Sequence, residues 1–354
     1  MTAPRPADGS SARPTTWLVR TTYPPLSLRV ERRAVLVGLI LVLLTIVMGF
    51  VALTTGTSST TLSDVLSALT GSADRRIQTL VVEWRLPRLL LAIVCGAALG
   101  MSGTVFQSLT RNPLGSPDII GFSAGSYTGA LIVMLFVGSV RYYDVAAAAL
   151  VGGIVTAIIV YALSYRGGVQ GFRLIIMGIG LTAILASVNS YLLLSADLTD
   201  AMVAAAWGAG SLNSLGFDQF WPTLTVFAVM APLTLALGPG LRQLELGDDT
   251  ASALGLGAER LRLSAMVLGV ALTALVTAAA GPIAFIALAA PQVAKRLTRS
   301  SGIGLLPAAL TGALLLVVAD VVAVQIALPV GVVTVSIGGG FLLWQLVREF
   351  KERA

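Results

Sequence analysis

Ten apolar segments of membrane-spanning length follow one another along most of this chain. A helix needs about 20 mostly apolar residues to cross the ~30 Å hydrocarbon core of a bilayer. Hydrophobic residues make up 56% of the 354 residues and charged residues only 11%, too few to cover a soluble domain of this size. The sequence therefore predicts an all-α, polytopic membrane protein. The ten segments are Ala34–Leu53, Pro87–Ser108, Pro117–Val137, Val145–Ser164, Leu174–Leu194, Phe220–Leu237, Leu263–Ala280, Ile283–Ala294, Leu305–Ala323 and Gly331–Val347.

The eighth segment is short for a crossing, and the distribution of basic residues decides how it is counted. Cytoplasmic loops of membrane proteins carry an excess of Lys and Arg. With ten crossings and a cytoplasmic N-terminus, 18 basic residues lie inside and five outside. If the eighth segment does not cross, the counts become 12 and 11. The sequence thus favours ten transmembrane helices with both termini cytoplasmic.

The parts outside the spans have their own expected organisation. Residues 1–33 are polar, Pro-rich and Arg-containing, and are expected to form a disordered cytoplasmic tail before a membrane domain at 34–350; residues 351–354 form a short cytoplasmic tail. Thr61–Leu69 reads as a short amphipathic helix outside, stopped by Gly71. The cytoplasmic loop Glu245–Arg262 reads as two short helices, the first ending at Gly255 and the second starting after Gly257.

Several kinds of chemistry are excluded by residues that the chain lacks. It has no histidine and a single cysteine, Cys95, so it cannot build a His/Cys zinc site, a disulfide or a Ser-His dyad. No GxxxxGK[ST] phosphate loop occurs, so an ATP-driven role requires a partner subunit. The basic residues flank apolar segments instead of forming one run, which argues against nucleic acid as a partner. We therefore expect no catalytic residue, bound cofactor or metal in this chain.

Two sets of glycines recur at the four-residue spacing that brings membrane helices close together. Gly96 and Gly100 lie in the second span, and Gly121, Gly125 and Gly129 are expected on one face of the third. Small residues permit close backbone approach in lipid, so helix packing is the expected role. A direct role in substrate passage is the alternative.

One ionisable side chain, Asp320, is expected well inside a span. An intramembrane carboxylate is by default a hypothesis of function, such as proton coupling. A carboxylate near a helix end can instead be a structural acceptor satisfied by the neighbouring backbone. Both interpretations stay open here, and the second is favoured because a coupled carrier usually carries several midplane charges.

Four stretches resemble the FecCD family, the permease subunits of bacterial ABC importers for iron–siderophore complexes and cobalamin. They are Arg85-Leu86-Pro87-Arg88 followed by Cys95–Gly103; Thr110–Gly121; Leu254-Gly255-Leu256-Gly257; and Gly281–Phe285 continuing through Ala290-Pro291, Ala319-Asp320 and Leu328–Gly331. The residues of these motifs are most similar to those of the ferric-enterobactin-type permease. Two positions depart from the pattern: Gln292 stands where the family commonly has His, and Val324 where it often has Arg. The missing arginine suggests an asymmetric docking surface, as in importers built from two different permeases.

The resemblance implies two contact sites. Arg85 and Arg88, spaced i, i+3 at a helix start on the outer face, would dock acidic residues of a substrate-binding protein; snorkelling to lipid headgroups is the alternative. The cytoplasmic loop would couple to an ATPase, the alternative being a helix that lies on the membrane surface. The coupling residues would be Asp248, Asp249, Ala251, Leu254, Gly255 and Gly257.

The resemblance also implies the function and its partners. The chain would be the permease half of an ABC importer in the bacterial cytoplasmic (inner) membrane, moving an iron–siderophore complex inward. Its partners would be a second, distinct permease, two ATP-binding subunits and an extracytoplasmic substrate-binding protein. Alternatives are an importer of the same family for cobalamin or haem, a proton-coupled secondary transporter working alone, and a non-transporting membrane scaffold.

Overall fold

The computed structural model describes residues 16–21, 26–56, 58, 60–165, 171–253, 255, 257–300, 302 and 304–353. Within these residues the fold is helical except for one β-hairpin near the N-terminus. The expected all-α class is therefore confirmed for the body of the molecule.

A β-hairpin occupies part of the N-terminal tail that was expected to be disordered. Strand β1 (Thr16–Thr21) pairs antiparallel with β2 (Leu26–Glu31), with Thr16 opposite Glu31 and Thr21 opposite Leu26. Both strands are rich in β-branched and apolar residues, which suit paired strands. The prediction of disorder is wrong for these strands, and residues 1–15 lie outside the described part of the chain.

Each of the ten predicted spans corresponds to a helix. Among the described residues, seven helices are long and apolar enough to cross a membrane, and residues 122–137 and 330–340 form shorter apolar helices. The chain is thus a multi-pass membrane protein. The helices at the ten spans are α1 (Arg32–Thr54), α4 (Leu86–Thr110), α5 (Phe122–Ile132) with the π-helical η2 (Val133–Val137), α6 (Tyr142–Ser164), α7 (Gly171–Ser195), α9 (Phe217–Ala236), α12 (Ala258–Ala280), α13 (Ile286–Thr298), α14 (Leu305–Gln325) and α15 (Val330–Arg353).

The helices between the spans were only partly predicted. The expected amphipathic helix is α2 (Leu62–Leu69), which begins with a capping box formed by Thr61 and Asp64. The structure adds α3 (Arg75–Gln78) and the π-helical η1 (Thr79–Arg85), which run without interruption into α4, and also α8 (Leu198–Gly208) and α10 (Gly238–Glu245). In the inner loop, α11 (Asp248–Ala253) is separate, whereas the expected second short helix is the first part of α12.

The short eighth segment combines two conformations. Residues 281–285 are not helical, and α13 starts three residues later than expected and ends four residues later. The non-helical backbone is tolerated because it is enclosed by protein: Gly281 lies against Trp207 and Gly210.

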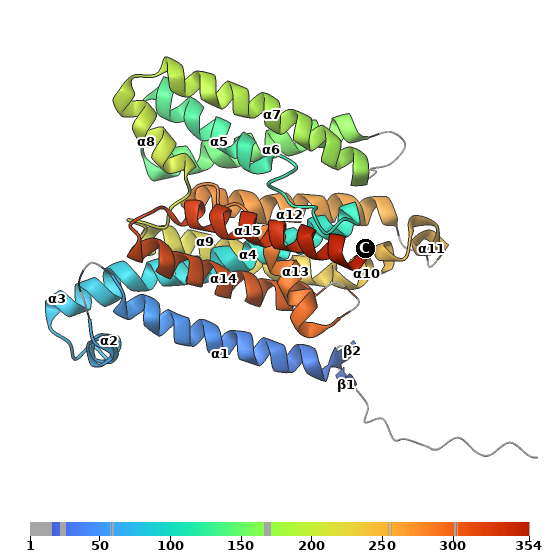
Figure 1. The fold of residues 1–354 in the computed structure, drawn as a ribbon, viewed down its shortest axis with the longest axis horizontal. Helices are drawn as coiled ribbons and strands as arrows, with labels where there is room; N and C mark the ends of the chain where they lie inside the picture. Colours follow the sequence, from blue (N-terminus) through green and yellow to red (C-terminus); the bar gives the residue numbers. More distant parts are fainter. Residues whose placement is uncertain are drawn as a thin grey trace, which may run out of the picture.

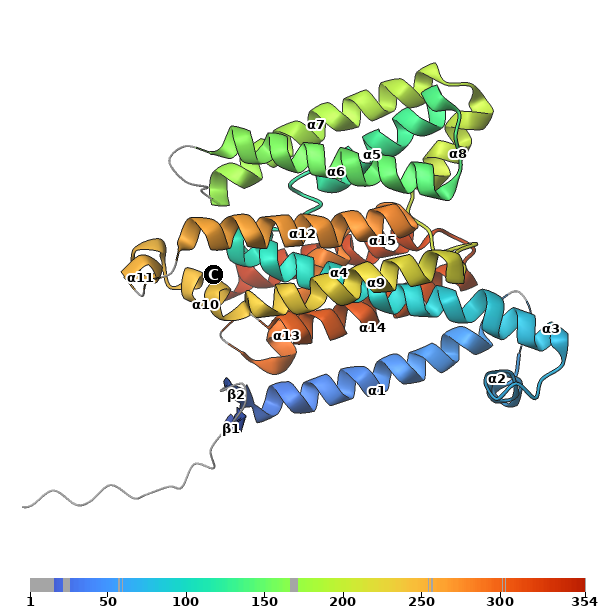
Figure 2. The ribbon, with the colours of Figure 1, turned by 180° about the vertical axis from the view of Figure 1, so that it is seen from behind.

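Helix α4 lies at the centre of the molecule. It packs along α14, α12, α13 and α9. In the continuous helix Arg75–Thr110, which ends with α4, 89% of the residues of an 18-residue apolar stretch are buried. Figures 1 and 2 show α5, α6, α7 and α8 as a group on one side of this centre and α1 on the other. In the corresponding apolar stretches of α1 and α7 only 11% of the residues are buried, which leaves most of their apolar side chains for lipid or for other subunits.

The bundle has two distinct ends. The end that carries the β-hairpin, α10, α11 and the last residues of α15 is called the hairpin end, and the end that carries α2, α3 and the start of α4 is called the α2 end (Figure 1). The hairpin and the end of α15 therefore lie at the same end of the bundle. This arrangement requires an even number of passages between the two ends.

Candidate functional site

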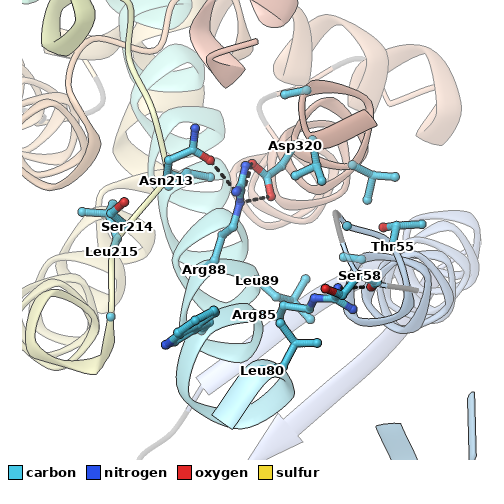
Figure 3. Close-up of a pocket in the computed structure, with 18 of the residues that line it drawn as sticks. Thr55, Ser58, Leu80, Arg85, Arg88, Leu89, Asn213, Ser214, Leu215 and Asp320 are labelled. Atoms are coloured by element: carbon cyan, nitrogen blue, oxygen red, sulfur yellow. Dashed lines mark hydrogen bonds and ion pairs between the residues drawn. The ribbon is translucent and has the colours of Figure 1, made fainter. Parts of the chain in front are cut away.

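A cavity of about 780 Å³ opens at the α2 end of the bundle. Its walls come from the end of α1, from η1 and the start of α4, from the loop before α9, and from the end of α14. Figure 3 shows the polar side chains that converge there. The ionisable residues in its lining are Glu83, Arg85, Arg88 and Asp320.

Arg88 and Asp320 form a bidentate ion pair in this cavity. Nε of Arg88 donates to both carboxylate oxygens of Asp320 at 3.1 and 2.9 Å, and Nη2 donates to Oδ1 at 2.8 Å. The Asp320 side chain is 6% exposed and the Arg88 side chain 20%. A carboxylate this buried requires a charged or strongly donating partner, and the fork of Arg88 supplies both.

This pairing changes the interpretation of Asp320. The sequence placed it alone in its span, satisfied by nearby backbone, whereas its partner comes from a helix 232 residues earlier in the chain. A third side chain, Asn213, completes the arrangement by accepting a hydrogen bond from Nη1 of Arg88 (Figure 3). Asn213 was not predicted, because an isolated polar residue in a loop carries no local signal of its partner.

Arg85 is engaged in a different direction. Its Nη1 donates to the Leu53 carbonyl at 2.7 Å and to Oγ1 of Thr60 at 2.7 Å, and its Nη2 donates to the Ser58 carbonyl at 2.6 Å. The i, i+3 spacing of Arg85 and Arg88 predicts that they face nearly the same way, and this is wrong: these acceptors draw Arg85 toward the end of α1, while Asp320 draws Arg88 toward α14 (Figure 3). Arg85 ties together two segments of its own chain.

The expected packing glycines lie at two helix crossings. A side chain on Gly96 or Gly100 would collide with the α14 backbone at Gly312 or Ala308. A side chain on Gly125 or Gly129 would collide with α6. Gly121 differs: it is the residue before α5, with φ of 93°, and does not lie on the helix face. Its expected place on one face with the other two is therefore wrong, because the helix starts at Phe122.

At the hairpin end, α11 forms the expected short element before α12. Gly255 has φ of 79°, which suits the turn that was expected there. Ala251 is fully buried in a cluster with Leu241, Leu244 and Ala265, so it packs inside this chain and does not project. Gly257 precedes α12. The side chains of Asp248 and Asp249 and the whole of Leu254 lie outside the described residues.

Sequence reasoning missed two further polar clusters. Asp118 accepts a hydrogen bond from Ser123 Oγ at 2.6 Å, while its buried Oδ2 has no hydrogen-bond partner within the described residues. Near the hairpin end, Gln292 donates to Oε1 of Gln107 at 2.6 Å, beside a cavity of about 420 Å³. The unusual glutamine at position 292 therefore has a specific partner on α4.

Comparison with known proteins agrees with the resemblance in the motifs. The model of the FecCD transport family matches residues 43–348. The chain is 47% identical over 328 residues to the ferric enterobactin transport system permease protein FepG of Escherichia coli (strain K12), covering 92% of this chain and 99% of FepG. It is 34% identical to FepD of the same organism, covering 91% and 98%.

A solved structure supports the same conclusion. A metal-chelate type ABC transporter in an inward-facing conformation matches with a TM-score of 0.77 at 25% identity, over 89% of this chain and 99% of that one. The family model, the relatives and this structure each cover nearly the whole membrane domain. The chain belongs to the FecCD transport family.

Proposed function

We propose that this chain is the permease subunit of an ABC importer that carries an iron–siderophore complex across the bacterial inner membrane into the cytoplasm. The observation that carries the proposal is the 47% identity to a ferric enterobactin permease over 99% of that protein's length. Relatives named for Fe(3+)-citrate and iron(3+)-hydroxamate import match at 32% and 33% identity. Uptake of radiolabelled ferric enterobactin, ferric citrate and a ferric hydroxamate by cells that carry or lack the chain would identify the cargo. If cells that lack the chain still take up all three complexes, the proposal is contradicted.

The proposed topology has ten crossings with both termini in the cytoplasm. A helix stands at each of the ten spans, and the hairpin lies at the same end as the last residues of α15. The hairpin end also carries Arg33, Arg111 and Lys295, in agreement with an excess of basic residues on the cytoplasmic side. In a Cys95→Ser background, Asp74→Cys should react with a membrane-impermeant maleimide in spheroplasts, and Arg299→Cys only after lysis. The opposite labelling pattern would refute this orientation.

The importer would be completed by other chains. A second, distinct permease is favoured because the chain matches both FepG and FepD, two permeases named for the same transport system. Two ATP-binding subunits would hydrolyse ATP, because this sequence contains no phosphate loop. A siderophore complex is large, so its pathway would lie at the interface of the two permeases. Recovery of the second permease and the ATPase with tagged chain tests this assembly.

Arg88 would provide the contact to the binding protein. It lines an open cavity at the proposed outer end, whereas Arg85 is occupied by acceptors of its own chain. The double change Arg85→Glu, Arg88→Glu should weaken the affinity for the binding protein, most strongly at low ionic strength, and should leave the ATPase bound. The two single variants show which arginine causes the loss of affinity. Arg141→Glu, a charge reversal at the same end of the bundle, is the control. Unchanged affinity for the binding protein at low salt would show that these arginines are not the docking site.

The segment from Asp248 to Gly257 would couple to the ATPase. Because Ala251 is buried within the chain, the contact would come from Leu254, the turn at Gly255 and the residues around them. Leu254→Asp should release the ATPase or uncouple it, since a buried unpaired charge costs several kcal/mol. Leu66→Asp, on the exposed face of α2, is the matched control. An ATPase that stays bound and coupled in the Leu254 variant would show that coupling occurs elsewhere.

A proton-coupled carrier is the second candidate, because Asp320 is a carboxylate within the span α14. Its bidentate bond to Arg88 favours a fixed charge over one that exchanges protons. In proteoliposomes with ATP and an uncoupler, Asp320→Asn should still accumulate substrate if the chain is an ABC permease. Loss of uptake in a correctly assembled variant would favour the carrier.

A further inference from the structure

We propose that Asp320 competes with the binding protein for Arg88, holding this guanidinium in the free importer and yielding it to a carboxylate of the docking partner. The inference rests on the proposed docking function of Arg88 and adds to it an internal counter-ion. It follows from three features of the cavity at the α2 end: its charge, the hydrogen bonds of Arg88 and the different exposure of the two paired side chains.

The charge of the cavity does not favour an acidic partner as it stands. Its ionisable lining comprises Arg85 and Arg88 against Glu83 and Asp320, so the formal charges cancel. Arg85 is further occupied by two carbonyls and a hydroxyl. A docking site for carboxylates would therefore be neutral while Asp320 holds Arg88. Release of Arg88 from Asp320 is what would make a cation available.

The hydrogen bonds of Arg88 leave room for a second acceptor. A guanidinium has five N–H donors. Within the described residues, the Nε–H and one N–H of Nη2 bond to Asp320 and one N–H of Nη1 bonds to Asn213, which leaves one N–H on each terminal nitrogen. These two N–H groups can donate to an incoming carboxylate. The partner can thus engage Arg88 before the bond to Asp320 is broken.

Two carboxylates on one guanidinium leave an excess negative charge in a confined site, which disfavours the shared state. The Arg88 side chain is 20% exposed and the Asp320 side chain 6%, so an incoming group reaches Arg88 from the cavity while Asp320 stays behind it. Exchange of partners resolves the repulsion, because the long arginine side chain turns more easily than the helix α14. The strength of the Asp320 contact therefore subtracts from the affinity for the binding protein.

The test measures affinity in the assembled importer. The complete complex in nanodiscs, without ATP, is titrated with the substrate-binding protein that supports its uptake in vesicles, at low and at moderate ionic strength. Asp320→Asn keeps the shape and a hydrogen-bond acceptor but removes the competing charge. It should tighten binding about tenfold at low salt, the scale expected for one charge-assisted contact. Asp74→Asn removes an exposed carboxylate at the same end of the bundle and should change affinity less than about twofold.

A double-mutant cycle separates competition from a general charge effect. Arg88→Gln should weaken binding, and Asp320→Asn should bring no gain in the Arg88→Gln background, because there is no guanidinium to release. A gain that persists without Arg88 would overturn the proposal in favour of long-range repulsion. If Asp320→Asn does not assemble, the exposed Asn213→Ala variant decides: removal of this second acceptor should also tighten binding, and no gain overturns the proposal.

The outcomes distinguish the inference from the function on which it rests. If Arg88→Gln weakens binding but Asp320→Asn leaves it unchanged or weaker, the docking site stands and the competition is refuted. If Arg88→Gln has no effect, the docking site itself is refuted, and the competition with it.

Discussion

A single methyl group at Gly96 should separate α4 from α14, two helices whose backbones pack closely. A Cβ on Gly96 would lie 2.8 Å from the carbonyl carbon of Gly312 and 2.8 Å from Cα of Ala313, both backbone atoms of α14. Carbon atoms in optimal contact lie ~3.5–4.0 Å apart, so α4 and α14 would have to move apart by about 1 Å. A gap of this size forfeits a quarter to a half of each lost dispersion contact along the crossing.

The expected cost follows from these distances. Overpacking at a close contact costs about 1–3 kcal/mol. In exchange, replacing a helical glycine by alanine gains ~0.5–1 kcal/mol from backbone entropy. Gly96→Ala should therefore lower the free energy of unfolding by about 1–2 kcal/mol. Gly180→Ala in α7 is the matched control, since among the described residues no atom outside the local helix backbone lies within 4 Å of the added carbon, and it should be neutral or stabilising.

The measurement is the free energy of unfolding of the purified chain in mixed micelles titrated with SDS. The two variants make the same chemical change in a membrane helix, so helix propensity contributes equally and their difference isolates the crossing. That difference should be about 2 kcal/mol. Equal stability of Gly96→Ala and Gly180→Ala would refute the packing argument for the α4–α14 pair.

Further predictions concern two polar groups and one close packing contact. Asp118→Ala should destabilise the chain by about 1–3 kcal/mol in the same assay, because it leaves the Ser123 hydroxyl without its acceptor and opens a gap, whereas Ser123→Ala should cost less. The hydroxyl and the N–H of Thr61 lower the pKa of Asp64, so the capping box contributes stability above the ordinary aspartate pKa and loses it as the pH falls below about 4. The protection factors of the α2 amides, taken relative to the intrinsic exchange rate at each pH, should fall in that range, and Asp64→Asn should remove this pH dependence; protection factors that stay constant down to pH 2 would contradict it. Gly338→Val should disturb α13 as well as α15, because the Phe285 ring lies against Gly338. A Gly338→Val variant as stable as Gly339→Val, where no described atom outside the local helix backbone lies within 4 Å, would contradict this contact.

The sequence alone was sufficient where the physical cause is local. Apolar runs of bilayer length predicted a helix at each of ten places, because only internally hydrogen-bonded helices are stable in lipid. The amphipathic pattern of Thr61–Leu69 predicted α2 for the same kind of reason, since its apolar positions recur within one short helix. The motifs from Arg85 to Gly331 identified the family.

The tertiary structure decided what the charged residues do. Arg85 and Arg88 are neighbours on one helix, yet one bonds to the end of α1 and the other to Asp320 on α14. No local spacing encodes these partners, because they come from helices that only the folded bundle brings beside α4. The same holds for residues 281–285, whose non-helical backbone is enclosed by neighbouring parts of the bundle: Gly281 lies against Trp207 and Gly210. Local sequence specifies which segments enter the membrane, whereas the buried polar contacts depend on how those segments pack.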